Sequence, residues 1–91
     1  MTEEEARKRL EAMREELAAI EHERWSHWQR YLHSKGDRQQ DGSLLLPANL
    51  VVQWEHQMTT AYAMLSETEK QSDREQVERY ASLIATRFGA D

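Results

Sequence analysis

The sequence predicts an all-α fold: a three-helix bundle with a long first helix and a polar loop between helices 1 and 2. Apolar residues recur at three- and four-residue spacing over most of the chain, as they do on one face of an α-helix. Thr2 and Ser66 are each followed three residues later by glutamate, which is the capping-box pattern of a helix start. Residues 34–46 form the one clear polar, glycine-punctuated interruption.

The first helix is expected from about Glu3 to His33. It would span roughly 45 Å, whereas the other two would span roughly 30 Å. Its N-terminal half then either overhangs its partners and exposes an apolar stripe, or the helix is kinked and folds back. We expect self-association through this helix in an antiparallel or globular contact, because repulsive charges would flank the seam of a parallel coiled coil. The stripe comprises Leu10, Met13, Leu17 and Ile20, and it shifts phase to Trp25, Trp28 and Leu32.

Residues 34–46 are expected to be a mobile loop whose last residues, Leu44–Leu46, return to the core. Pro47 suits the first position of the second helix, where its missing N–H costs nothing. The apolar spacing predicts that this second helix continues to Leu65.

The third helix is expected to begin at Ser66, whose side chain caps it, and to end at Gly89. Arg87 in the last turn suits the negative end of the helix dipole. The three helices are expected to form a single domain over residues 1–91. The residues predicted to face inward from the third helix are Val77, Tyr80, Ile84 and Phe88.

The charge of the chain argues against two classes of partner. Seventeen acidic and 12 basic side chains give a net charge of −5, spread along the sequence. A diffuse negative charge disfavours binding to a nucleic-acid backbone or to an anionic membrane. The acidic start, M-T-E-E-E, is unlike a secretory signal, and no apolar run approaches the ~20 residues of a membrane span. With no cysteine, the expected setting is the cytoplasm.

Neither a metal site nor a catalytic site is expected. His22 and His27 are five residues apart, whereas a zinc-protease helix needs two histidines four apart. Glu23 and His27 have helical spacing, but two ligands do not make a zinc site. The serines lack the context of a nucleophile elbow, and three glycines do not form a phosphate-binding loop. We therefore expect a protein that is not an enzyme and has no cofactor.

The string Y-x-x-L-S-E-x-E-K-x-x-D-R spans the junction of the second and third predicted helices. Lys70 and Arg74 share one helical face, and Asp73 lies beside them. One interpretation is an ion-pair network that locks the third helix to the first through Glu21 or His22. The spacing alone favours this lock.

The other interpretation is a basic clamp for an anionic small molecule beside Trp25 and Tyr62. The planar guanidinium of Arg74 suits phosphate or carboxylate, and Lys70 adds a second positive charge. The aromatic residues at helical spacing are otherwise expected to pack as core. The candidate ligand-binding residues are Lys70, Arg74, Asp73, Tyr62, His22 and Trp25.

Two strings, H-E-R-W and the junction motif, resemble the RyR domain, the small repeat of ryanodine receptors that also occurs alone in bacterial and phage proteins. The resemblance covers about half of the chain, which also looks like short phage or prophage proteins. It implies a nucleotide-like ligand. The family's G-W-x-Y-G segment is absent, Ala61 replaces its proline, and a full helix replaces its short extended linker. The matching residues are His22, Trp25, Tyr62, Leu65, Ser66, Glu69, Lys70, Asp73 and Arg74.

The expected function is therefore a non-catalytic cytoplasmic binding module of phage or prophage type, which binds an anionic nucleotide-like ligand as RyR domains are suspected to do. The alternative is an acidic protein–protein inhibitor or adaptor that acts on a host protein, which suits the small size, the diffuse charge and the polar loop. A structural phage component is a third hypothesis.

Overall fold

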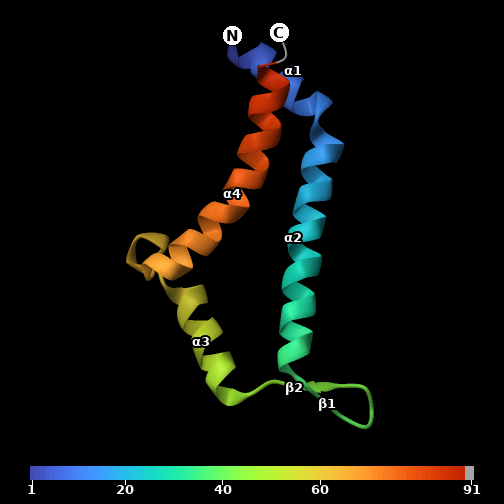
Figure 1. The fold of residues 1–91 in the computed structure, drawn as a ribbon, viewed down its shortest axis with the longest axis vertical. Coiled ribbons are helices and arrows are strands. Elements are labelled where there is room, and N and C mark those ends of the chain that lie inside the picture. Colours follow the sequence, from blue (N-terminus) through green and yellow to red (C-terminus); the bar gives the residue numbers. More distant parts are fainter. Residues whose placement is uncertain (90–91) are drawn as a thin grey trace.

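The computed structural model describes residues 1–89 and is 78% helical, which confirms the mainly α-helical class. Residues 90 and 91, which belong to the predicted domain of residues 1–91, lie outside the described part. The predicted three-helix bundle is wrong in its packing, since α2 forms one side of an open frame and α3 with α4 forms the other (Figure 1). The elements are α1 (Glu3–Ala12), α2 (Arg14–Lys35), β1 (Asp37–Arg38), β2 (Leu44–Leu45), α3 (Ala48–Thr59), the 3₁₀ turn η1 (Tyr62–Met64) and α4 (Glu67–Phe88).

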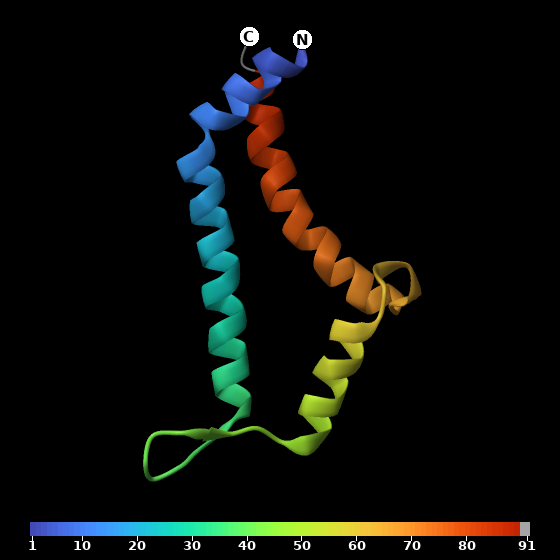
Figure 2. The same cartoon turned by 180° about the vertical axis from the view of Figure 1, so that it is seen from behind.

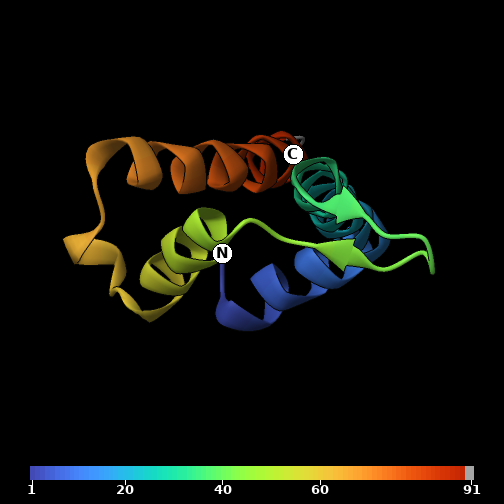
Figure 3. The same ribbon diagram turned by 90° about the horizontal axis from the view of Figure 1, so that it is seen from below.

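The frame is long and thin. Its Cα atoms extend over 54 × 33 × 18 Å, and the radius of gyration is 17.9 Å, whereas a compact domain of this length has about 12 Å. The α2 and α4 helices converge near the termini and diverge toward α3 (Figures 1 and 2). Viewed along the long axis, α4 and α1 lie on opposite sides of the thin dimension (Figure 3). The arrangement leaves the inner sides of the helices largely without a packing partner from the same chain.

The first predicted helix is interrupted at Met13, where φ is −106° and ψ is 14°. The Met13 N–H donates to the Leu10 carbonyl at 3.1 Å, the tighter spacing of a 3₁₀ turn, before α2 continues. The bend directs α1 across the end of α4, where the Arg9 guanidinium donates to the Phe88 carbonyl at 3.3 Å. The unbroken first helix is thus wrong, and the alternative of a kinked helix holds. Burial of Met13, which is only 2% exposed, outweighs helical continuity.

Residues 34–46, predicted as a mobile loop, contain a hydrogen-bonded antiparallel hairpin in which Asp37 lies opposite Leu45. Gly42 closes its turn with a φ of +91°, a region that glycine enters without steric cost. A Cβ atom at Gly36 would lie 3.0 Å from a side-chain carbon of Leu44, so glycine also permits the close approach of the two arms.

The α3 helix ends at Thr59, six residues before the predicted end at Leu65. Thr60 is extended, with φ −101° and ψ 130°. The Thr59 hydroxyl donates to the Glu55 carbonyl at 2.8 Å, and the Thr60 hydroxyl donates to the His56 carbonyl. Such side-chain bonds from β-branched residues compete with further helical turns. The predicted continuous face is therefore divided between α3 and η1.

Two of the three predicted helix starts, at Thr2 and Ser66, are confirmed, whereas the second helix begins at Ala48 and Pro47 is its extended N-cap. The Thr2 hydroxyl accepts from the Glu5 N–H at 3.1 Å. The Ser66 hydroxyl accepts from the Glu69 N–H at 3.2 Å, and the Glu69 carboxylate accepts from the Ser66 N–H at 3.2 Å. Each cap satisfies backbone donors that have no partner within the first helical turn.

Candidate functional site

An open hollow of about 610 Å³ lies on the inner side of the frame, between α2 and the α3–α4 side. Large apolar side chains from both sides line it. Trp28 and Tyr31 come from α2, Met58 comes from α3, and Leu65 lies just before α4. Met58 is 77% exposed, and Trp28 and Tyr31 are each 41% exposed. Contiguous apolar surface of this kind typically marks an interaction site.

The aromatic residues do not form the core that the sequence predicts. Within residues 1–89, Met13 is the only buried apolar residue. The Trp28 and Trp54 rings meet edge to face at 5.4 Å, and Trp28 also stacks with Tyr31 at 5.7 Å. These contacts join α3 to α2 but leave much of the Trp28 surface in solvent. The prediction was wrong because helical periodicity shows which face is apolar, not whether another element covers it.

The two walls of the hollow carry opposite charge. The α2 wall presents Arg24 and His27, whereas the α4 wall presents Glu69, Asp73 and Glu75. An acidic and a basic wall on one open surface suit a partner that carries both signs of charge.

Ionic contacts attach α4 to α2 where the two helices converge. Glu21 of α2 accepts hydrogen bonds from Arg24 on its own helix and from Tyr80 on α4. The other cross-helix pairs join Arg79 to Glu23 and Arg87 to Glu16. Glu21 thus joins these helices through Tyr80, whereas Lys70 and Arg74, the cations of the predicted lock, pair with Glu67 on α4 itself.

These contacts shift two pKa values in opposite directions. Hydrogen bonds from Arg24 and Tyr80 hold the pKa of Glu21 below its ordinary 4.5. The hydrogen bond that Tyr80 donates to Glu21 raises the pKa of the Tyr80 phenol above its ordinary 10.0. The folded protein therefore favours the ionised Glu21 and the neutral Tyr80.

The stabilisation from the Tyr80–Glu21 contact should be confined to a pH window. The Glu21 contribution is present above its ordinary pKa of 4.5 and is lost as the pH falls through the lowered value. The Tyr80 contribution is present below 10.0 and is lost as the pH rises through the raised value. We expect the stability difference between the native protein and Tyr80→Phe to be flat between these limits and to shrink outside them. Urea unfolding from about pH 3 to about pH 11 measures it, and a difference independent of pH would contradict the assignment.

Three of the predicted ligand-binding residues converge at the start of α4. The Lys70 ammonium lies 5.8 Å from the centroid of the Tyr62 ring. Glu67 pairs with both cations, with nitrogen–oxygen distances of 3.8 Å to Lys70 and 3.1 Å to Arg74. Hydrogen bonds to Glu67 and then Tyr62 raise the pKa of Arg74. Both cations of the predicted clamp thus already have a carboxylate partner on the same helix.

The other three predicted residues lie elsewhere. His22 and Trp25 stack on each other at 6.1 Å along α2, and Trp25 is 57% exposed. Trp25 borders a shallow depression together with Arg30 and His33. Asp73 faces the hollow as part of the α4 wall. The structure brings Tyr62, Lys70 and Arg74 together and groups His22 with Trp25 separately.

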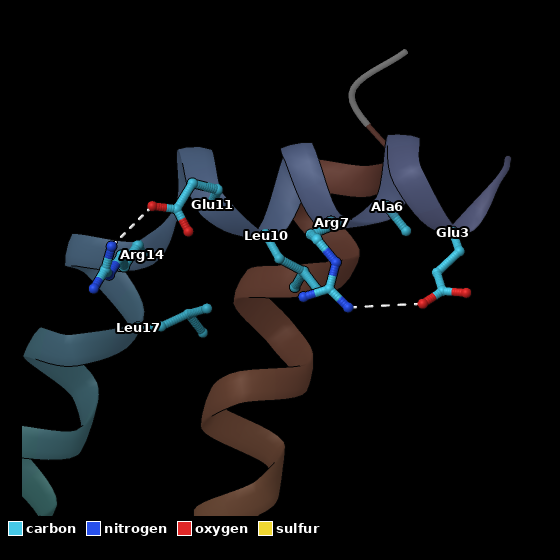
Figure 4. A pocket seen from close by; sticks show the side chains of 7 residues that line it. All are labelled: Glu3, Ala6, Arg7, Leu10, Glu11, Arg14 and Leu17. Atoms are coloured by element: carbon cyan, nitrogen blue, oxygen red, sulfur yellow. Dashed lines mark hydrogen bonds and ion pairs between the residues drawn. The ribbon is translucent and has the colours of Figure 1, made fainter.

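A second depression, of about 350 Å³, lies in the elbow between α1 and α2 (Figure 4). Its apolar lining consists of Ala6, Leu10 and Leu17. Two ion pairs border it, Arg7 with Glu3 at 3.6 Å and Arg14 with Glu11 at 2.9 Å. The elbow exists because the helix bends at Met13, so part of the apolar stripe predicted for self-association lines this depression.

Sequence reasoning did not identify Met58, Tyr31 and Gln76 as residues of one surface. Helical spacing shows which face of the second predicted helix is apolar, but it contains no signal that the face of Met58 is open. The carboxylates of α4 carry no local signal either, since only the tertiary arrangement sets them opposite Arg24.

Within residues 1–89, no group of three or more histidine, aspartate or glutamate side chains is arranged to hold a metal ion. No helix in the described range is long and apolar enough to cross a bilayer.

Comparison of the chain with protein-family models, with curated proteins and with solved structures finds no match in any of the three. The resemblance to the RyR domain is neither supported nor refuted by these comparisons and stays a prediction.

Proposed function

We propose that this chain is a non-catalytic protein-binding module whose inner face, defined by Trp28, Tyr31, Met58 and Leu65, receives an amphipathic helical surface of a protein partner. The observation that carries the proposal is the exposure of Trp28, Tyr31 and Met58 around one hollow, which half-buried Leu65 also lines. Transfer of such side chains from water to an apolar contact contributes about 25 cal/mol per Å². Leaving Trp28, Tyr31 and Met58 in contact with water is therefore costly for an isolated chain, and this cost favours association with a partner.

The charges of the hollow support a protein partner over a nucleic acid or a lipid surface. Carboxylates line one wall, and the chain as a whole carries −5. An amphipathic helix presents an apolar stripe flanked by charges of both signs, which matches a hollow whose apolar lining lies beside Arg24 on one side and carboxylates on the other. The cytoplasmic setting and the phage or prophage type belong to the same proposal and rest on composition and on the resemblance.

Photo-crosslinking at two matched positions tests this function. Met58 and Met64 are 77% and 78% exposed, but only Met58 lines the hollow. We expect a photoreactive amino acid at position 58 to give a discrete protein adduct in the cells from which the chain comes, and the same group at position 64 to give only background. Equal yields at both positions would contradict the proposal.

A second candidate function is suggested by the convergence of Lys70 and Arg74 at Tyr62. An anionic small molecule, of the nucleotide-like class that the resemblance implies, would displace Glu67 and take both cations, since a phosphate offers more acceptor oxygens than one carboxylate. Titration calorimetry with nucleotides and cyclic nucleotides should then show binding that Arg74→Ala weakens by roughly tenfold or more. Absence of heat with every compound would remove this candidate.

A further inference from the structure

We infer that the partner covering the inner face is a second copy of this chain, related by a twofold axis that sets each α2 wall against the α4 wall of the other subunit. The inference rests on the proposed function, because it names the occupant of the same face. It assigns the predicted self-association of the first helix to α2, the part of that helix beyond the bend at Met13.

The chain exposes more surface than a compact monomer of its mass, and the excess is larger than one side of a standard interface. The chain exposes 7401 Å², whereas a compact monomer of 10.8 kDa exposes about 5,500 Å². The excess is therefore roughly 1,900 Å² per chain, and a standard protein–protein interface buries about 800 Å² per partner. Interfaces above this size are typical of subunits that are stable only together.

The charge pattern of the hollow is complementary to itself. In a twofold contact the same patch serves both subunits, so each side of the patch must fit the other side. The α2 wall carries the cation of Arg24, which also pairs with Glu21 of its own helix, beside His27, and the α4 wall is acidic, with Glu69, Asp73 and Glu75. Apposition of α2 on α4 therefore brings Arg24 against carboxylates twice, whereas α4 on α4 would oppose like charges.

Sedimentation equilibrium of the purified full-length chain at micromolar concentration tests the inference. We expect a mass of twice 10.8 kDa for the native protein. Met58→Glu places a carboxylate in the apolar contact and should weaken dimerisation by roughly 100-fold. Met64→Glu alters a residue of similar exposure outside the hollow, so it should change the dimer dissociation constant by less than about threefold. Circular dichroism checks that both variants keep the helical content of the native protein.

The results that overturn the inference differ from those that overturn the proposed function. A dimer that Met58→Glu leaves intact would mean that another face associates, so the assigned interface would be wrong. A monomer at all concentrations that keeps a radius of gyration near 17.9 Å in solution scattering would exclude the second copy and leave the face free for another protein. A monomer with a radius of gyration near 12 Å would mean that the chain closes its own hollow, which would overturn both.

Discussion

Replacement of Met13 by alanine is expected to lower the free energy of unfolding by about 2–4 kcal/mol. Met13 is the only buried apolar residue within residues 1–89, and it lies at the bend that directs α1 across the end of α4. Truncation removes its contacts and leaves a cavity at the bend between α1 and α2. For a domain of this size the loss corresponds to a drop in Tm of roughly 10–25 °C, measurable by circular dichroism at fixed protein concentration.

Two control substitutions make this prediction specific. Met13→Leu conserves volume and should cost less than about 1.5 kcal/mol. Leu10→Ala removes a neighbouring side chain that is already 39% exposed, so its cost should be well below that of Met13→Ala. Equal losses for Met13→Ala and Leu10→Ala would show that Met13 is not the centre of the packing.

Replacement of Trp28 by alanine should have the second-largest effect, about 2–3 kcal/mol. A fully buried tryptophan costs about 3–5 kcal/mol on truncation, and Trp28 is 41% exposed, so part of that loss applies. The substitution should loosen the attachment of α3 to α2, because the contact between Trp28 and Trp54 joins these two helices. Urea unfolding at constant protein concentration measures the loss.

Trp25→Ala is the matched control, one helical turn away on α2. Trp25 is 57% exposed and stacks on His22 of its own helix, so its loss should be below about 1 kcal/mol. A double-mutant cycle of Trp28→Ala and Trp54→Ala should give a coupling of about 0.5–1.5 kcal/mol, the usual range for an edge-to-face pair. A coupling near zero would mean that the two rings do not hold α3 in place.

The elements that could be predicted are those set by residues close together in the chain. The caps at Thr2 and Ser66 depend on a hydroxyl and a backbone N–H three residues away. The polar loop of residues 34–46 could likewise be predicted from composition, although the hairpin within it could not. Of the candidate site, the convergence of Lys70 and Arg74 follows from helical spacing alone.

Other features depend on contacts between residues far apart in the sequence. The bend at Met13 contains neither proline nor glycine and coincides with the one buried apolar residue within residues 1–89. The early end of α3 needed the hydroxyls of Thr59 and Thr60 to prefer backbone carbonyls over a further helical turn. Because Glu21 bonds to Tyr80, 59 residues away, no local pattern identified the partner in the lock.

Local side-chain chemistry thus determined that this chain is helical, where two of its helices begin, and which of their faces are apolar. Only the tertiary arrangement decided that α2 and α4 diverge and leave the face of Trp28 and Met58 uncovered. The physical reason is that apolar periodicity shows which face of a helix is driven out of water. Which segment covers that face depends on contacts between residues far apart in the sequence or in another chain. In the arrangement proposed for this protein, those contacts come from a second chain.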